Sequence, residues 1–115
     1  MEFSESLKKN RDFQEVYRKG TSAASRQFVM YVLENGTSRN RLGISVSKKV
    51  GNSVVRHTVT RRVREAYRLQ EQQFRKGKDI VVIARMPAAQ CTQEEVGKAL
   101  VYLGKKLHIR EDALQ

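Results

Sequence analysis

Cysteine, a secretion signal and long apolar runs are scarce or missing in this chain, and each absence removes a class of protein. The single cysteine, Cys91, cannot form an internal disulfide, so we expect it to be a bystander with no disulfide partner. No apolar run approaches the ~20 residues that a membrane-spanning helix needs. Residues 1–9 lack the apolar segment of a secretory signal, so a cytoplasmic location is expected.

Side chains that could carry out chemistry by themselves are also sparse. His57 and His108 are far apart, and neither has a metal-ligand spacing with Cys, Asp or Glu. The adjacent Glu94 and Glu95 are explained by capping and by the dipole of the helix that they open. Glycine motifs for phosphate or dinucleotide binding are missing. Because a metal nuclease needs clustered carboxylates, we predict no catalytic residue and no metal ligand in this chain.

Acidic residues are absent from the whole stretch between Glu34 and Glu65. The basic residues of that interval are Arg39, Arg41, Lys48, Lys49, Arg56, Arg61, Arg62 and Arg64. The chain as a whole carries a formal net charge of +11, and its 39% of hydrophobic residues suits a soluble globular protein. Such a block of one sign indicates a surface that meets a polyanion. Nucleic acid is the leading partner, an anionic membrane the second, and a merely basic protein the remaining alternative.

The length favours one domain, residues 1–115, with one modest core. Hydrophobic patterns, caps and turns predict a helix, a strand hairpin, a helix, a strand and a helix. The helices start at Asn10, at Asn52 or Ser53, and at the capping box of residues 92–95; the first ends before Gly20 and the second at residues 76–78. The strands are residues 26–33, 41–47 and 79–84, and the tail from Arg110 is expected to be frayed. This order predicts an α+β layer sandwich, a mixed sheet covered by helices.

Basic residues on the second helix recur at a spacing that places them on one face. This face carries His57, Arg61, Arg64 and Arg68, with Arg56 and Thr60 beside it. The apolar stripe that should meet the core consists of Val55, Val59, Val63, Ala66, Tyr67, Gln70 and Phe74. Like charges one turn apart destabilise a bare helix, so a sequence that accepts this cost is expected to use the face. An arginine face that is merely solvated stays the alternative.

Aromatic residues gather on the first helix and the first strand. Phe13, Val16 and Tyr17 share a helix face, where Phe13 and Val16 are expected in the core and Tyr17 is left open. One face of the strand carries Phe28, Met30 and Val32, and the other carries Val29, Tyr31 and Leu33. The returning strand has a small face made of Gly43, Ser45 and Ser47. That face either packs closely under a helix or forms the floor of a groove.

The segment of residues 42–56, followed by Arg61 and Arg64, resembles the protein subunit of bacterial ribonuclease P. It reads LGISVSKKVGNSVVR. The likeness continues at residues 9–17 (KNRDFQEVY), 20–22 (GTS), 26–31 (RQFVMY) and 79–87 (DIVVIARMP). It covers nearly the whole chain, and these motifs are highly specific in this order and spacing.

The resemblance implies a noncatalytic protein subunit of an RNA-based endoribonuclease. In that family the RNA subunit removes the 5′ leader from precursor tRNA with Mg²⁺, which is held mainly by the RNA, while the protein binds the leader and supports the metal-dependent active form. The implied partners are ribonuclease P RNA and the precursor tRNA leader, with no membrane. The implied fold is a two-layer sandwich, a four-stranded mixed sheet with three helices and a left-handed β-α-β crossover. The alternatives are a ribosomal-protein-like RNA-binding scaffold and, below it, a stand-alone nuclease.

The resemblance also implies two sets of site residues. The RNA subunit is expected to be bound by Lys48, Lys49, Asn52, Arg56, His57, Thr60, Arg61, Arg64 and Arg68. The leader is expected in a central cleft lined by Phe13, Tyr17, Val29, Tyr31, Ser45 and Ser47. Phe28 also matches the family's lining, but it points opposite to Tyr31 along its strand and is expected in the core. The family's motif reads Arg-Asn-x-x-Lys-Arg-x-x-Arg, and here His57 replaces its asparagine and Thr60 its lysine.

Overall fold

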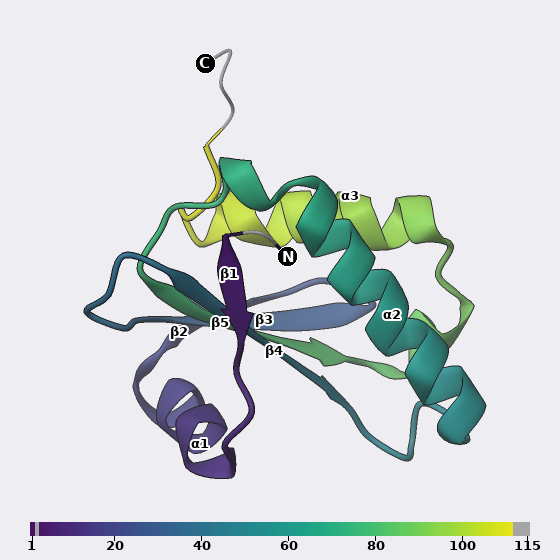
Figure 1. Ribbon diagram of the computed structural model, residues 1–115. Helices are drawn as coiled ribbons and strands as arrows, with labels where there is room; N and C mark the ends of the chain where they lie inside the picture. The colour runs from purple at the N-terminus through teal and green to yellow at the C-terminus, as the bar shows by residue number, and fades with distance from the viewer. Residues whose placement is uncertain (2, 112–115) are drawn as a thin grey trace.

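Five strands form one mixed sheet at the centre of the computed structural model, which describes residues 1 and 3–111 (Figure 1). The strands are β1 (Ser4–Ser6), β2 (Thr21–Ala24), β3 (Phe28–Glu34), β4 (Asn40–Val46) and β5 (Lys78–Ala84). Their order across the sheet is β1-β4-β5-β3-β2. β4 runs parallel to β1 and β5, whereas β3 runs antiparallel to β5 and β2. β5 is therefore the central strand, as its unbroken apolar run predicted.

Three α-helices cover the sheet: α1 (Asn10–Lys19), α2 (Ser53–Leu69) and α3 (Gln93–Lys106). Two short 3₁₀ helices, η1 (Glu71–Gln73) and η2 (Met86–Gln90), follow α2 and β5. α2 and α3 pack side by side on one face of the sheet, and α1 lies on the other face (Figure 1). The α+β class, the mixed sheet and the three helices are confirmed. The two predicted layers are extended by α1, which forms a partial third layer.

The hydrophobic core has two parts because the sheet is covered on both faces. The larger part lies between the sheet and α2 with α3, and it contains Phe28, Met30 and Val32 of β3. The smaller part lies under α1 and contains Leu7, Val16 and Val81 as its buried members. The expected alternation of β3 is thus confirmed, and Phe28 is fully buried in the larger part.

The sequence patterns located three strands and the resemblance implied four, but the sheet has five. β1 and β2 are the two strands that the patterns did not predict. β1 has three residues and β2 has four, too few to produce a recognisable alternation of apolar and polar side chains. β1 is held by hydrogen bonds that no local pattern reveals. The Ser4 hydroxyl lies 2.8 Å from the Tyr67 hydroxyl, and the Asn40 side-chain amide donates to the same Tyr67 oxygen at 3.2 Å. This buried network ties β1 to α2 and β4.

Several predicted boundaries are also corrected. α2 ends at Leu69, where Gln70 caps it and η1 turns the chain. Phe74 is still buried, but the chain reaches it through this turn and not by continuing the helix. The predicted frayed tail is wrong for Arg110 and Glu111. Arg110 forms a β-bridge with Phe74, and Glu111 forms an ion pair with Arg75 at 3.2 Å; the remaining tail lies outside the described residues.

The predicted starts of α2 and α3 agree with the structure, whereas the predicted end of α2 does not. Asn52, and not Ser53, caps α2, and the reciprocal capping box of Thr92 and Glu95 opens α3. Asn10, expected as a cap, is the first residue of α1 and follows Lys9.

β4, α2 and β5 form a β-α-β unit in which the two parallel strands are neighbours. The left hand of its crossover stays a prediction of the resemblance. Within the described residues, no helix is long and apolar enough to cross a bilayer.

Candidate nucleic-acid interface

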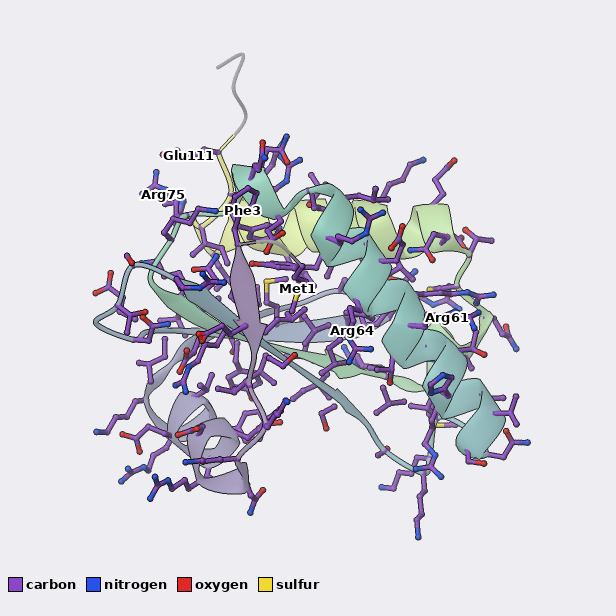
Figure 2. The ribbon with its side chains drawn as sticks, in the orientation of Figure 1. Met1, Phe3, Arg61, Arg64, Arg75 and Glu111 are labelled. Atoms are coloured by element: carbon purple, nitrogen blue, oxygen red, sulfur yellow. The ribbon has the colours of Figure 1, made fainter. Side chains whose placement is uncertain are left out.

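The outer face of α2 exposes the side chains of His57, Arg61, Arg64 and Arg68, as their spacing predicted. We call this the arginine face. Figure 2 shows Arg61 and Arg64 on this helix. Among residues 1 and 3–111, neither guanidinium has a hydrogen-bond or ion-pair partner. Both can therefore offer their full set of donors to a phosphate, which a guanidinium can bind through two parallel hydrogen bonds.

The other arginines of α2 are engaged within the protein. Arg68 donates to both carboxylate oxygens of Glu65, at 2.9 and 2.7 Å, and this bond lowers the pKa of the Glu65 carboxyl. Arg56 donates through Nε to the Gly51 carbonyl at 3.2 Å. Arg62 donates to the Cys91 carbonyl at 2.6 Å and so fastens α2 to the end of η2. Of the arginines of α2, only Arg68 is paired with a carboxylate, and only Arg61 and Arg64 have all their donors unused within the described residues.

Thr60, which replaces the lysine of the family motif, is turned back onto the helix. Its hydroxyl donates to the Arg56 carbonyl at 2.9 Å. The hydroxyl proton is thus used inside α2, and only the oxygen lone pairs remain for a ligand. The substitution therefore removes a positive charge from the arginine face without supplying a free donor.

The loop before α2 adds charge at the positive end of the helix. Lys48 and Lys49 are exposed there. The side-chain oxygen of Asn52 caps the helix by accepting a hydrogen bond from the Val55 amide at 3.0 Å, and its side-chain NH₂ group is the donor that remains for a phosphate. The first turn of α2 contains no acidic residue. The helix dipole is therefore not compensated by a carboxylate, and it favours an anion beside the two lysines.

On the opposite face of the sheet, Phe13 and Tyr17 of α1 and Tyr31 of β3 form a half-buried group that we call the aromatic cluster. The rings of Tyr17 and Tyr31 are 5.1 Å apart and meet edge to face, and those of Phe13 and Tyr17 are 6.3 Å apart. Burial raises the pKa of the Tyr17 phenol, a hydrogen bond with Ser45 opposes this shift, and nearby Tyr31 adds to it. Tyr17 is thus part apolar and part polar in its surroundings.

The structure unites most, but not all, of the predicted leader-binding residues. Ser45 lies beside Tyr17, and Val29 shares the Tyr31 side of β3. Ser47 lies beyond the end of β4 and is exposed, and no described contact joins it to the aromatic cluster. Hence the expected small face of β4 contributes Ser45 to the cluster but does not bring Ser47 into it.

Gly43 provides the floor on which α1 rests. A Cβ atom built at this glycine would lie 2.6 Å from Cζ of Phe13, well inside van der Waals contact. The Phe13 ring therefore lies directly on the backbone of β4. The small face of β4 was expected either to pack closely under a helix or to form the floor of a groove. At Gly43 it packs closely under α1.

One structural network was missed by sequence reasoning. Arg41 donates to both oxygens of Asp79, at 2.8 and 2.6 Å, and lies 3.5 Å from a carboxylate oxygen of Asp12. The bond to Asp79, which is only 4% exposed, raises the pKa of Arg41. Arg41 therefore connects α1 to β4 and β5 and is a structural member of the basic block. The parallel pairing of β4 with β5 places Arg41 opposite Asp79. The sequence did not reveal this register, so it could not predict the ion pair.

Groups for metal or covalent chemistry do not gather on these surfaces. Within the part of the chain that the structure describes, no three His, Cys, Asp or Glu side chains lie close enough together to hold a metal ion. Cys91 is buried, and burial raises the pKa of its thiol, which disfavours the reactive thiolate. The arrangement is suited to binding anions and planar rings.

Comparison with known proteins assigns the chain to a family. The family model described as Ribonuclease P matches residues 1–108. The chain belongs to this family. A "Ribonuclease P protein component" of Lachnoclostridium phytofermentans is 51% identical over 102 residues, which cover 89% of this chain and 88% of the relative. Another from Bacillus cereus (strain B4264) is 48% identical over 101 residues, 87% of this chain and 88% of the relative.

Solved structures agree with the family assignment. The RNase P protein of Staphylococcus aureus has 41% identity and a TM-score of 0.86, covering 94% of this chain and 99% of that chain. The RNase P protein from Thermotoga maritima has 34% identity and a TM-score of 0.81, and the match covers 89% of this chain and 96% of that chain. The resemblance found in the sequence motifs is therefore confirmed, together with the ribonuclease P protein fold.

We expect Gly43→Ala to disturb the aromatic cluster, because the added methyl group displaces the Phe13 ring. The cost of such overpacking should be about 1–3 kcal/mol in the free energy of unfolding, measured by urea denaturation. Gly97→Ala is the matched control, since a Cβ atom at Gly97 of α3 meets nothing within 4 Å. This control should be neutral or stabilising by up to about 1 kcal/mol. Equal stability of the two variants would contradict the assigned role of Gly43.

Proposed function

We propose that this chain is the protein subunit of ribonuclease P and that it assists an RNA catalyst in removing the 5′ leader from precursor tRNA. The observation that carries the proposal is the position of two differently built surfaces on opposite faces of one sheet. One is the arginine face, with unpaired Arg61 and Arg64; the other is the aromatic cluster. A protein bearing both can hold a folded RNA and a single strand at the same time.

The arginine face binds the RNA subunit through its phosphates. Arg61 and Arg64 provide the strongest contacts because no acceptor in the described part of the chain competes for their donors. Lys48 and Lys49 extend the charge beyond the N-terminus of α2. Arg68 on this face, and Asn52, Arg56 and Thr60 beside it, contribute less, because each already makes a hydrogen bond within the protein. His57 lies on the same face. Binding of this kind weakens steeply as salt is added.

The aromatic cluster binds the unpaired leader by stacking. Tyr17 and Tyr31 are half-buried, so each ring is held in place by the core while part of it can meet a base. Ser45 can form a hydrogen bond with the RNA leader, Val29 adds apolar surface, and the Phe13 ring packs against Tyr17. Stacking accepts any base, so this site suits leaders of many sequences.

Cleavage itself is assigned to the RNA subunit. Mg²⁺ at the reacting phosphate would neutralise its charge and polarise its oxygens, and the RNA is the expected holder of that ion. The protein contributes by reducing repulsion between two polyanions, since each neutralised phosphate lowers the ionic cost of bringing the substrate to the RNA. Its benefit should therefore be greatest when Mg²⁺ is scarce. This work is expected to take place in the cytoplasm.

Reconstitution tests this proposal against its alternatives. The protein is mixed with a bacterial ribonuclease P RNA and precursor tRNA at low Mg²⁺, and release of the leader is followed with time. We expect faster cleavage and tighter substrate binding than with the RNA alone. A scaffold of ribosomal-protein type would bind the RNA but would neither speed cleavage nor tighten substrate binding. A stand-alone nuclease would cleave precursor tRNA in the absence of the RNA. Either result would reject the proposal.

Arg61→Ala should weaken binding to the RNA subunit by roughly ten-fold, because a charge-assisted bond to phosphate is lost. It should also lower the slope of log affinity against log salt by about one. Arg62→Ala is the matched control, one residue along the same helix, because Arg62 is partly buried and donates to the Cys91 carbonyl. This control should lose stability more than RNA affinity. Equal losses of affinity in the two variants would contradict the assignment of the face.

Tyr31→Ala should weaken binding of precursor tRNA to the reconstituted enzyme by roughly five-fold or more, the lower end of base stacking on an aromatic ring. Binding of mature tRNA, which has no leader, should change little. Leu33→Ala removes a side chain from the same side of β3 without removing a ring, and it controls for lost packing. The assignment is wrong if Tyr31→Ala affects both tRNAs equally.

A further inference from the structure

Tyr102 on α3 is an exposed aromatic residue that neither proposed surface uses. The residue is 49% exposed. The Lys106 ammonium lies 5.9 Å from the centre of the ring, one turn further along the helix. Beside the ring is a hollow of about 290 Å³, lined by Ser25, Gln27, Glu95, Lys98, Ala99 and Tyr102. We call it the Tyr102 hollow.

The walls of this hollow are held in place before any ligand arrives. In the turn between β2 and β3, the Ser25 hydroxyl accepts a hydrogen bond from the Phe28 amide at 3.1 Å. Arg85 fastens the same turn, since its backbone amide donates to Gln27 and its guanidinium donates to the Ser25 carbonyl. On the other wall, Glu95 is fixed by the capping box that opens α3. A preformed hollow costs a ligand little ordering entropy.

The hollow lies on the flank of α3 that points away from α2. The segment that follows α2 meets the opposite flank of α3, because Gln70, the cap of α2, donates to the Gly97 carbonyl and a Cβ atom at Gly104 would lie 3.0 Å from Phe74. At 3.6 residues per turn, Tyr102 is rotated by roughly 140–160° from both glycines. The arginine face and the Tyr102 hollow therefore belong to one layer of helices but to different flanks of it.

Three basic side chains border the hollow, together with the carboxylate of Glu95 that lines it. Lys98 lines it, Lys106 lies over the ring, and Arg26 is exposed in the neighbouring turn, close enough to help lower the pKa of Glu95. Glu95 accepts from the Thr92 amide. Glu94 pairs with Lys98 at 3.4 Å, and because this pair is exposed and weak, a phosphate can replace the Glu94 carboxylate at Lys98. An aromatic ring beside a shallow hollow with a basic rim fits a nucleobase with its phosphate.

We propose that the Tyr102 hollow binds one unpaired nucleotide of the RNA subunit, with the base against Tyr102 and the phosphate near Lys98 and Lys106. This inference rests on the proposed function. The RNA subunit is the source because α2 and α3 lie on the same face of the sheet, whereas the aromatic cluster for the leader lies on the other. A helix is only ~10 Å wide, so an RNA that rests on α2 can extend across α3.

The first test measures affinity for ribonuclease P RNA without substrate. Tyr102→Ala should bind this RNA roughly five-fold or more weakly, the lower end of the loss that follows removal of a stacking ring. Tyr102→Phe is the matched control, because it keeps the ring and removes only the hydroxyl, and it should bind as the parent does. Urea denaturation should show equal stability for both, since the residue is exposed. If Tyr102→Ala binds the RNA with an affinity within about two-fold of the parent's, the inference is overturned.

The second test identifies the RNA by cross-linking. A photoreactive phenylalanine analogue placed at position 102 of the full chain should cross-link to a defined unpaired nucleotide of the RNA subunit. Cross-links to the leader of precursor tRNA, or to no RNA, would overturn the inference. The parent protein is assayed for cleavage in the same preparation. If it accelerates cleavage while Tyr102→Ala binds normally, only the inference fails; if it does not, the proposed function fails as well.

Discussion

The burial of β5 on both faces is the constraint on which the rest of the structure depends. A central strand that is apolar on both sides needs cover on both sides, and the chain supplies α2 with α3 on one face and α1 on the other. This arrangement separates the arginine face from the aromatic cluster by the thickness of the sheet. The two proposed RNA contacts are therefore held apart by the core itself, and a strand bound to one does not obstruct the other.

Three of the carboxylates in this basic protein, Asp12, Glu71 and Asp79, are placed where the fold needs them. Asp79 and Asp12 hold Arg41 and join α1 to the sheet. Buried Glu71 accepts a hydrogen bond from the Phe3 amide and so supports the N-terminal strand. With these acids used internally, Arg61 and Arg64 keep their charge uncompensated. The repulsion along α2 is tolerated because the opposite side of that helix is packed into the core.

Long elements with a clear period could be predicted from the sequence, and short ones could not. The core side of α2 and the alternation of β3 followed from spacing alone. β1 and β2 could not be foreseen, because each is held by its neighbour in the sheet more than by any preference of its own residues. The end of α2 was misplaced for a related reason: buried Phe74 kept the helical spacing although the chain turns at Gln70.

The sequence by itself determined the class of fold, the basic block and the family, since these depend on local periodicity, composition and ordered motifs. The tertiary structure decided which basic residues are available. Arg41 and Arg62 look equivalent to Arg61 in the sequence, yet the first two are bound to Asp79 and Cys91 and the third is free within the described chain. It also placed Tyr102 beside the turn that completes its hollow. Ion pairs and hollows join residues far apart in the chain, and only packing brings such residues together.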